Sequence, residues 1–287
     1  MRNVDENTIT PGVLELIEKT PNPRLRQIMS ALIRHLHDFA REVQLTEQEW
    51  FEGIRFLTDV GHITDERRQE FILLSDTLGL SMLVIAQNNR KPPGCTEATV
   101  FGPFYVENAP QYPLGADLAR GARGEPCYVQ ATIKGHAGEE VPGARVEVWQ
   151  ADAGGLYDMQ YEAGEHRARG VLRADEKGHV HFKSVLAEAY QIPTDGPVGR
   201  MLEATARHAW RPAHMHFMIE APGYERLITH VFRDGDRWLD SDAVFGVRSS
   251  LITKWERHPP GRAPDGTDSD IPFHTLNFDF VLNKGAA

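Results

Sequence analysis

Two histidines separated by one residue are the first candidates for chemistry in this sequence. His214 and His216 are followed directly by an apolar run, from Phe217 to Ile219. On a β-strand, residues i and i+2 point to the same side, so the two imidazoles would stand next to each other at a separation that one metal ion can bridge. Most such pairs are surface histidines, but the apolar run favours a buried pair and therefore a metal site.

The residues alone leave the kind of metal site open. A zinc site needs a third histidine or a carboxylate, and His230 on the next predicted strand could supply it. A non-haem iron(II) site needs two histidines and one carboxylate, but no carboxylate is evident beside this pair. Tyr157 and Tyr190 lie in loops of unusual composition, although a single tyrosine is more often a core or interface aromatic whose hydroxyl is paired.

The segment before residue 100 has a helical pattern. Thr46 and Glu49 form a capping box that predicts the start of a helix, and another helix is predicted over 65–80. An earlier helix is indicated by apolar residues that recur at spacings of three to four and share one face: Ile28, Leu32, Leu36 and Phe39. These apolar faces exceed what a single helical layer against a sheet needs, so we expect a homodimer through the N-terminal helices.

The segment after residue 125 has a β pattern, with short alternating or β-branched stretches between turn residues. The predicted strands are 128–133, 144–149, 170–174, 180–185, 214–219, 227–232 and 275–282. Many short strands with long loops are typical of a sandwich. We therefore predict a mainly β protein, in which an all-α N-terminal helical dimerisation domain over residues 1–105 precedes an antiparallel β-sandwich domain over residues 106–287.

Composition excludes several classes of partner. The formal net charge is −10 and no cluster of five or more Lys or Arg exists, which argues against nucleic acid and anionic membrane surfaces. No run of 18 apolar residues is present, so no membrane span is expected. The polar N-terminus lacks the apolar stretch of a secretion signal. Cys95 and Cys127 lie in no CxxC motif, and we expect two reduced thiols in a cytoplasmic protein.

Four segments of the chain, in this order and spacing, closely resemble the intradiol ring-cleaving dioxygenases. The matching segments are 100–105 (VFGPFY), 146–157, 190–199 and 211–217. The resemblance runs from about residue 71 to the C-terminus, with a weaker match over the N-terminal helices. It implies a β-sandwich enzyme that uses molecular oxygen to open an aromatic ring carrying two adjacent hydroxyls.

The resemblance implies a specific set of metal ligands. One Fe(III) per subunit would be bound by Tyr157, Tyr190, His214 and His216. Iron(III) is a hard cation that favours anionic oxygen ligands, and coordination lowers the phenol pKa from its ordinary value of about 10. The resemblance further implies that Tyr190 leaves the metal and takes up a substrate proton, while Arg211 stabilises negative charge that develops on the ring.

The substrate class is indicated by finer similarities. His230 stands where enzymes for plain catechol commonly carry glutamine, and the runs 73–76, 100–104 and 239–247 are similar to hydroxyquinol 1,2-dioxygenases. These enzymes convert 1,2,4-trihydroxybenzene to 3-hydroxy-cis,cis-muconate, which tautomerises to maleylacetate. The residues that the resemblance places around the substrate are Leu73, Asp76, Val100, Phe101, Gly102, Pro103, Phe104, Ile192, Pro193, Arg211, His230 and Val244.

Asp76 offers a physical reason for preferring a third hydroxyl. It lies three residues after Leu73, so both side chains can face the cleft from one helix. A carboxylate that catechol leaves unpaired would cost roughly 1–3 kcal/mol relative to hydroxyquinol. An exposed helical charge or a contact between helices is the alternative interpretation of Asp76.

Three alternatives remain at this point. The nearest is a catechol or chlorocatechol 1,2-dioxygenase with the same iron chemistry. A zinc hydrolase or lyase would use His214, His216 and His230, and a non-catalytic β-sandwich would only bind ligands. The expected partners are a small aromatic diol or triol, O2 and a second copy of the chain, with amphipathic lipid bound at the dimer interface as a looser implication of the resemblance.

Overall fold

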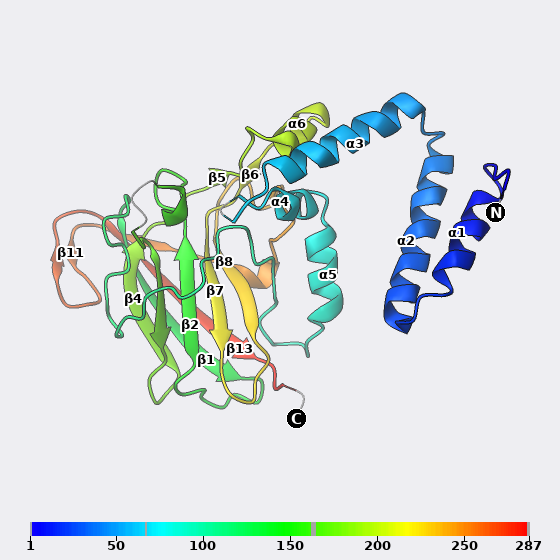
Figure 1. Cartoon of the computed structure of the whole chain (residues 1–287). Helices are drawn as coiled ribbons and strands as arrows, with labels where there is room; N and C mark the ends of the chain where they lie inside the picture. The colour runs from blue at the N-terminus through cyan, green and yellow to red at the C-terminus, as the bar shows by residue number, and fades with distance from the viewer. Residues whose placement is uncertain (1, 67, 162–164, 286–287) are drawn as a thin grey trace. The chain divides into compact units, whose positions relative to one another are not determined.

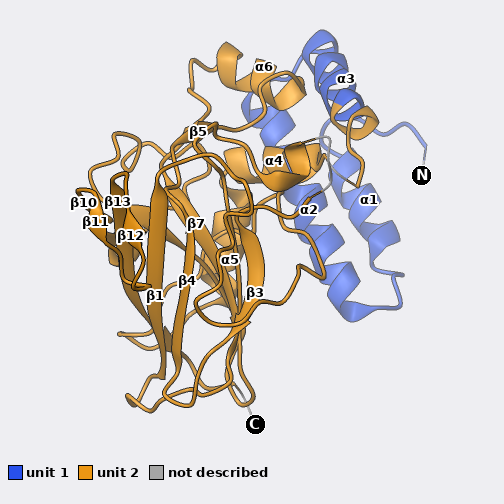
Figure 2. Cartoon of the chain, turned by 90° about the vertical axis from the view of Figure 1, so that its left-hand side faces the viewer, with its two compact units in different colours: residues 1–59 blue, residues 60–287 orange. Residues whose placement is uncertain are grey.

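The computed structural model describes residues 2–66, 68–161 and 165–285, which form two compact units. The first unit covers residues 1–59 and the second covers residues 60–287 (Figure 2). This division falls within a helix, and the domain boundary predicted between residues 105 and 106 stays a prediction.

The first unit is helical, and local caps explain where its helices begin. It contains α1 (Ile9–Ile17), α2 (Pro23–Glu42) and most of α3 (Glu47–His62). The backbone N–H of Leu25 donates to Asn22 Oδ1 over 3.0 Å, which caps α2. At α3 the N–H of Thr46 donates to Glu49 Oε2 over 2.9 Å, and the N–H of Glu49 donates to Thr46 Oγ1 over 3.3 Å. The predicted capping box is confirmed.

The second unit has three further helices beside its sheets. They are α4 (Glu70–Thr77), α5 (Leu80–Asn88) and α6 (Pro197–Ala204). The helix predicted over 65–80 is present but shorter, because α4 begins only at Glu70 and ends at Thr77. Gly79, with a left-handed backbone (φ 75°), separates it from α5. No single helix in the described ranges is long and apolar enough to cross a membrane. Taken together, α4 and α5 have the length and apolar composition of a membrane span, but the pair is bent by 78°.

Two sheets form the predicted sandwich. The four-stranded sheet has the order β10 (Glu256–His258), β13 (Phe273–Leu282), β1 (Pro126–Gly135), β4 (His179–Val185). The five-stranded sheet has the order β3 (Arg169–Arg173), β2 (Arg145–Gln150), β7 (His214–Glu220), β8 (Leu227–Arg233), β9 (Ile252–Thr253). Most neighbouring strands are antiparallel, as predicted, but β1–β13 and β8–β9 are parallel.

Short elements complete the second unit. Two-residue strands form the pairs β5 (Tyr190–Gln191) with β6 (Trp210–Arg211), and β11 (Gly261–Arg262) with β12 (Asp268–Ser269). The 3-10 turns are η1 (Asp158–Gln160) and η2 (Ser249–Leu251). Figures 1 and 2 both place β5, α4 and α6 beyond the same end of the sandwich strands.

Strand periodicity decides which side of the five-stranded sheet carries the polar residues. Met215, Phe217 and Ile219 of β7 belong to the hydrophobic core between the two sheets. Because side chains alternate along a strand, His214 and His216 lie on the outer face of the sheet. The site is therefore built outside the sandwich core, where the loops and helices of the second unit cover it.

Candidate metal centre

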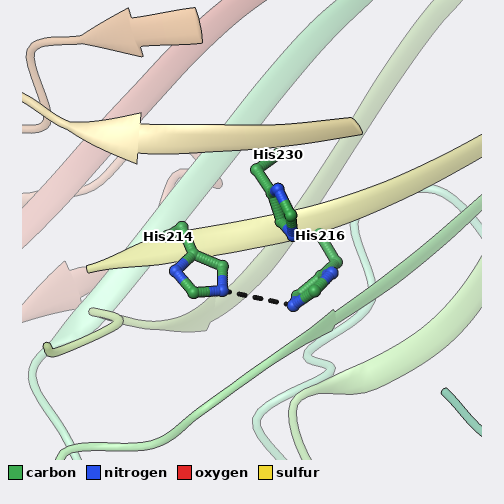
Figure 3. A group of neighbouring side chains, drawn as sticks. All are labelled: His214, His216 and His230. Atoms are coloured by element: carbon green, nitrogen blue, oxygen red, sulfur yellow. Dashed lines mark hydrogen bonds between the residues drawn. The ribbon is translucent and has the colours of Figure 1, made fainter. Parts of the chain in front are cut away.

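Four potential ligand atoms converge on one buried point of the second unit. The Nε2 atoms of His214 and His216 are 3.2 Å apart, and Figure 3 shows the two rings turned toward each other. The hydroxyl of Tyr157 lies 3.0 Å from His216 Nε2 and 3.4 Å from His214 Nε2. The hydroxyl of Tyr190 lies 3.4 Å from that of Tyr157. The structure thus brings together the four residues that were predicted to bind iron.

The two imidazoles are prepared to act as neutral ligands. His214 Nδ1 lies 2.7 Å from the carbonyl oxygen of Pro212, which can only accept, so Nδ1 carries the proton and Nε2 offers a lone pair. Burial, followed by the charge of Arg211, lowers the pKa of His214 to about 3. Burial also lowers the pKa of His216 well below its ordinary value. Both rings therefore stay uncharged, as metal binding requires.

The phenol of Tyr157 needs a cation to ionise in this environment. Burial, reinforced by the neighbouring Tyr190, raises the pKa of Tyr157 well above its ordinary value. A bound metal ion reverses this effect because it stabilises the phenolate directly. Among the described residues, Arg211 has the only polar side chain besides these four that lies within hydrogen-bond distance of a donor atom. The donor set therefore fits a buried metal ion.

Neighbouring residues fix the ring of His216. Trp149 on the adjoining strand β2 is its register partner, and the two rings stack at 4.7 Å with 18° between their planes. Gly102, in the segment 100–105, packs close to the same ring. Its backbone is left-handed (φ 79°), and a Cβ at this position would lie only 3.2 Å from His216 Cε1. A side chain at position 102 would press on the imidazole, so glycine is required there for both backbone and space.

His230 is the third histidine of this cluster. It lies on β8 opposite His216, and ligand atoms of all three histidines fall within 4.8 Å of one another (Figure 3). Its Nδ1 is already 2.5 Å from Thr99 Oγ1, whereas its buried Nε2 has no hydrogen-bond partner in the described part of the chain. His230 is thus next to the metal ligands and available to contact whatever enters the site.

Arg211 reaches the centre from β6, whose partner strand β5 carries Tyr190. Its guanidinium is buried, and Nη1 lies 3.4 Å from His214 Nε2. Its other side is held by Asp242, with 3.0 Å from Nε to Oδ1 and 3.3 Å from Nη2 to Oδ2. A buried cation at this point favours negative charge on any bound molecule.

A second buried ion pair holds the segment that carries Tyr157. Asp158 follows that tyrosine directly and accepts from Arg169, over 2.6 Å from Nη2 to Oδ1 and 2.8 Å from Nε to Oδ2. Arg169 Nη2 also donates to the carbonyl oxygen of Phe104 over 2.8 Å. The ring of Phe104 stacks on that of Tyr157 at 4.5 Å. One guanidinium therefore ties the tyrosine loop to the segment 100–105.

A cavity of about 240 Å³ is lined by Phe104, the residue whose ring stacks on that of Tyr157. Four of the predicted substrate contacts line it, namely Leu73, Pro103, Phe104 and Pro193. The metal donors themselves are not in its lining. Ile192, Val100 and Val244 are buried, whereas Phe101 is 37% exposed and meets Trp149 edge to face at 5.9 Å. The structure thus places four of these residues together in one cavity, and contact of the whole set with a substrate stays a prediction.

Asp76 is buried in α4, so the interpretation as an exposed charge is wrong. Burial raises the pKa of Asp76, while a hydrogen bond from Ser81 and the charge of Arg211 act in the opposite direction. The charges of Arg211 and Asp242 both act on this carboxyl. Asp76 is therefore a buried carboxyl, and its contact with a substrate stays a prediction.

Sequence reasoning missed the polar residues that support the ligands. Asp158, Arg169, Asp242 and Thr99 make the contacts described above, yet none belonged to a predicted site. The only available signal was position, because Asp158 adjoins Tyr157 and Asp242 lies within the run 239–247. Their partners are distant in sequence, and pairs of this kind are not visible without a fold.

Comparisons with known proteins agree with this geometry. Residues 100–284 match the family model described as Dioxygenase, and residues 22–96 match that described as Catechol dioxygenase N terminus. A 6-chlorohydroxyquinol 1,2-dioxygenase from Cupriavidus pinatubonensis is 59% identical over 284 residues, which cover 99% of each chain. A hydroxyquinol 1,2-dioxygenase from Nocardioides simplex is 52% identical over 278 residues, covering 96% of this chain and 95% of that protein.

A solved structure agrees over nearly the whole chain. Hydroxyquinol 1,2-dioxygenase from Pseudomonas putida DLL-E4 superposes with a TM-score of 0.89 at 48% identity, covering 98% of this chain and 99% of that one. Sequence, fold and the convergence of two tyrosines with two histidines lead to one family. The chain belongs to the intradiol ring-cleavage dioxygenases.

Proposed function

We propose that this dioxygenase binds one Fe(III) per subunit through Tyr157, Tyr190, His214 and His216, and that it cleaves hydroxyquinol between its adjacent hydroxyls. The observation that carries the proposal is the convergence of two phenol oxygens and two neutral imidazole nitrogens in one buried space. Two phenolates suit a hard trivalent cation better than they suit zinc. The names of the relatives at 48–59% identity support the substrate class.

The roles proposed for the residues are those that the family resemblance implies, and the positions of the side chains support them. Bound Fe(III) would supply the Lewis acidity that lets both hydroxyls of a chelating diol lose their protons, and the resulting dianion is electron-rich and reactive toward O2. Tyr157, His214 and His216 hold the metal, while Tyr190 accepts a proton from a substrate hydroxyl. Arg211 stabilises the negative charge that the ring gains when its hydroxyls ionise. Apolar side chains around the ring exclude water.

The decisive experiment compares products from three ring substrates. Iron-loaded enzyme is given hydroxyquinol, 6-chlorohydroxyquinol and catechol in separate reactions, and Tyr190→Phe serves as the control for autoxidation. We expect hydroxyquinol to yield 3-hydroxy-cis,cis-muconate and then maleylacetate, with both atoms of labelled O2 incorporated. Catechol turned over equally well or better would instead favour the catechol or chlorocatechol alternative.

Metal identity has a simple test that also addresses the zinc and binding-protein alternatives. The cluster of His214, His216 and His230 has a geometry that zinc could use. Ferric tyrosinate absorbs visible light, whereas a zinc protein is colourless. A coloured protein with about one iron per chain supports the proposal, and a colourless protein that is active with zinc would contradict it.

Asp76 is proposed to accept a hydrogen bond from the third hydroxyl of the substrate. Replacing it with alanine is expected to reduce the preference for hydroxyquinol over catechol by about tenfold to a hundredfold, because the buried acceptor is worth roughly 1–3 kcal/mol. The measurement is the ratio of kcat/KM for the two substrates. Asp240→Asn, at an exposed acid, is the control. An unchanged ratio in the Asp76 variant would remove this residue from substrate recognition.

We also propose a homodimer through the N-terminal helices, with amphipathic lipid at the interface. The predicted apolar face of α2 is uncovered within its own unit, since Ile28, Leu32, Leu36 and Phe39 are each 46–55% exposed. A second copy of the chain would cover such a face. We further propose a cytoplasmic location, because both cysteines are free thiols, as is usual in reducing compartments.

A charge on this apolar face is expected to separate the subunits. Leu36→Glu should raise the dimer dissociation constant by at least about a hundredfold, because a twofold interface loses two buried leucines worth roughly 1.5–3 kcal/mol each. Sedimentation across a range of concentrations measures the change. Arg34→Glu, at an exposed polar position of α2, is the matched control. A dimer of unchanged affinity in the Leu36 variant would move the interface elsewhere.

A further inference from the structure

Asp242 is a buried carboxylate outside the proposed ligand set and the predicted substrate contacts. Its side chain and that of Arg211 are each only 2% exposed. The two carboxylate oxygens face two nitrogens of the guanidinium, at 3.0 and 3.3 Å. A two-pronged pair of this kind fixes the plane of an arginine as well as its position.

The carboxylate is itself held by its own loop. Oδ1 accepts from the backbone N–H of Val244 over 3.3 Å, and Oδ2 accepts from that of Gly246 over 2.9 Å. The N–H of Ala243 donates to the carbonyl oxygen of Trp210 over 3.1 Å, which ties this loop to β6 beside Arg211. Asp242 is therefore a fixed acceptor, prepared by backbone bonds that do not depend on the arginine.

The Arg211–Asp242 ion pair leaves one guanidinium nitrogen, Nη1, directed at the donor set. Nε and Nη2 of Arg211 are engaged by Asp242, while Nη1 lies 3.4 Å from His214 Nε2. Without its anionic partner, a buried guanidinium would turn toward other acceptors or toward water to avoid an unpaired charge. The direction of Nη1 thus depends on Asp242.

Gly246 provides a second, independent observation at the same place. A Cβ at this position would lie 3.1 Å from Arg211 Nη2 and 3.2 Å from Asp242 Oδ2. Both distances are shorter than ordinary van der Waals contact, so a Cβ here would press on the ion pair and shift it by a few tenths of an ångström. The backbone of this loop thus packs directly against the arginine and its partner.

We propose that Asp242 is the positioning residue for Arg211, holding the guanidinium so that Nη1 faces the metal centre and the substrate bound there. The inference rests on the proposed function, because Asp242 acts only through the role given to Arg211. Part of the electrostatic stabilisation by Arg211 then depends on Asp242, a carboxylate outside the proposed ligand set and the predicted substrate contacts.

A double-mutant cycle in the iron-loaded enzyme tests this inference. Asp242→Asn keeps the shape of the side chain but presents an amide donor to the guanidinium, and it should lower kcat for hydroxyquinol by about 10–100-fold. In an Arg211→Ala background the same change should cost less than about twofold, because the residue it positions is gone. Asp240→Asn, on the same loop but exposed, should leave kcat unchanged.

A readout apart from turnover separates positioning from loss of structure. The visible absorption of the ferric protein should be retained in Asp242→Asn, and anaerobic titration with hydroxyquinol should give a Kd within about threefold of wild type. Equal losses of kcat in the two backgrounds, or an unchanged kcat, would overturn the inference. A wild-type enzyme that cleaves neither hydroxyquinol nor catechol would overturn the proposed function, and the inference with it.

Gly246→Ala keeps the inference testable if Asp242→Asn does not fold. The added methyl should displace the Arg211–Asp242 pair while all side chains of the site remain, and kcat should fall by about tenfold with the visible band retained. A Gly246→Ala enzyme with wild-type kcat would show that the geometry of this pair does not matter to the reaction.

Discussion

His216→Ala is expected to give a folded protein that lacks bound iron, visible colour and ring-cleavage activity. His216 Nε2 lies at the centre of the donor set, 3.0 Å from the Tyr157 hydroxyl and 3.2 Å from His214 Nε2. Loss of an outer partner of a metal ligand already costs about 10–100-fold in affinity or activity, so loss of a ligand itself should lower kcat by at least about a thousandfold. Iron content, visible absorption and kcat measure the three effects.

The chain offers a matched control for this variant. His179 and His181 on β4 have the same spacing on a strand, but both are exposed. His181→Ala should retain iron, colour and kcat, because among the described residues His181 belongs to no cluster that could hold a metal ion. Normal iron content and colour in His216→Ala would show that the metal lies elsewhere and would contradict the proposed ligand set.

This comparison also shows what strand periodicity could predict about the site. A histidine at i and i+2 predicts neighbouring imidazoles in both strands, but only the run after His216 is apolar enough to indicate burial. The periodicity therefore identified the pair that the structure buries side by side, and the resemblance supplied Tyr157 and Tyr190, which no pattern of the residues themselves singles out. Burial of all four in one place is a consequence of the fold.

The parts that sequence could not predict depend on tertiary contacts. Asp242 meets Arg211 across 31 positions of the chain, and Thr99 meets His230 across 131. No periodicity links such pairs. The helix predicted over 65–80 is longer at both ends than α4, because apolar spacing does not mark the residues at which a helix begins and ends. The left-handed backbone of Gly79 separates α4, which carries Asp76, from α5.

Tyr190→Phe is expected to retain iron but to lower kcat by about 10²–10⁴-fold, the usual contribution of a positioned acid or base. The backbone of Tyr190 pairs with that of Arg211 between β5 and β6, so phenylalanine can keep the position of the ring. Only the oxygen that lies 3.4 Å from the Tyr157 hydroxyl is lost. The substrate would then lack its proposed proton acceptor, while Tyr157, His214 and His216 remain to hold the metal.

Spectroscopy distinguishes this outcome from general damage to the site. One phenolate fewer should weaken and shift the visible band without abolishing it, whereas iron content stays near one per chain. Tyr161→Phe is the control, since its hydroxyl donates to Asp152 Oδ2 over 2.6 Å and belongs to no donor set. If Tyr190→Phe kept wild-type kcat, proton uptake would have to be assigned to another group, and the tyrosine would be a ligand only. If it lost its iron, the remaining three residues would be too few to hold the metal, and the separate roles proposed for the two tyrosines would fail.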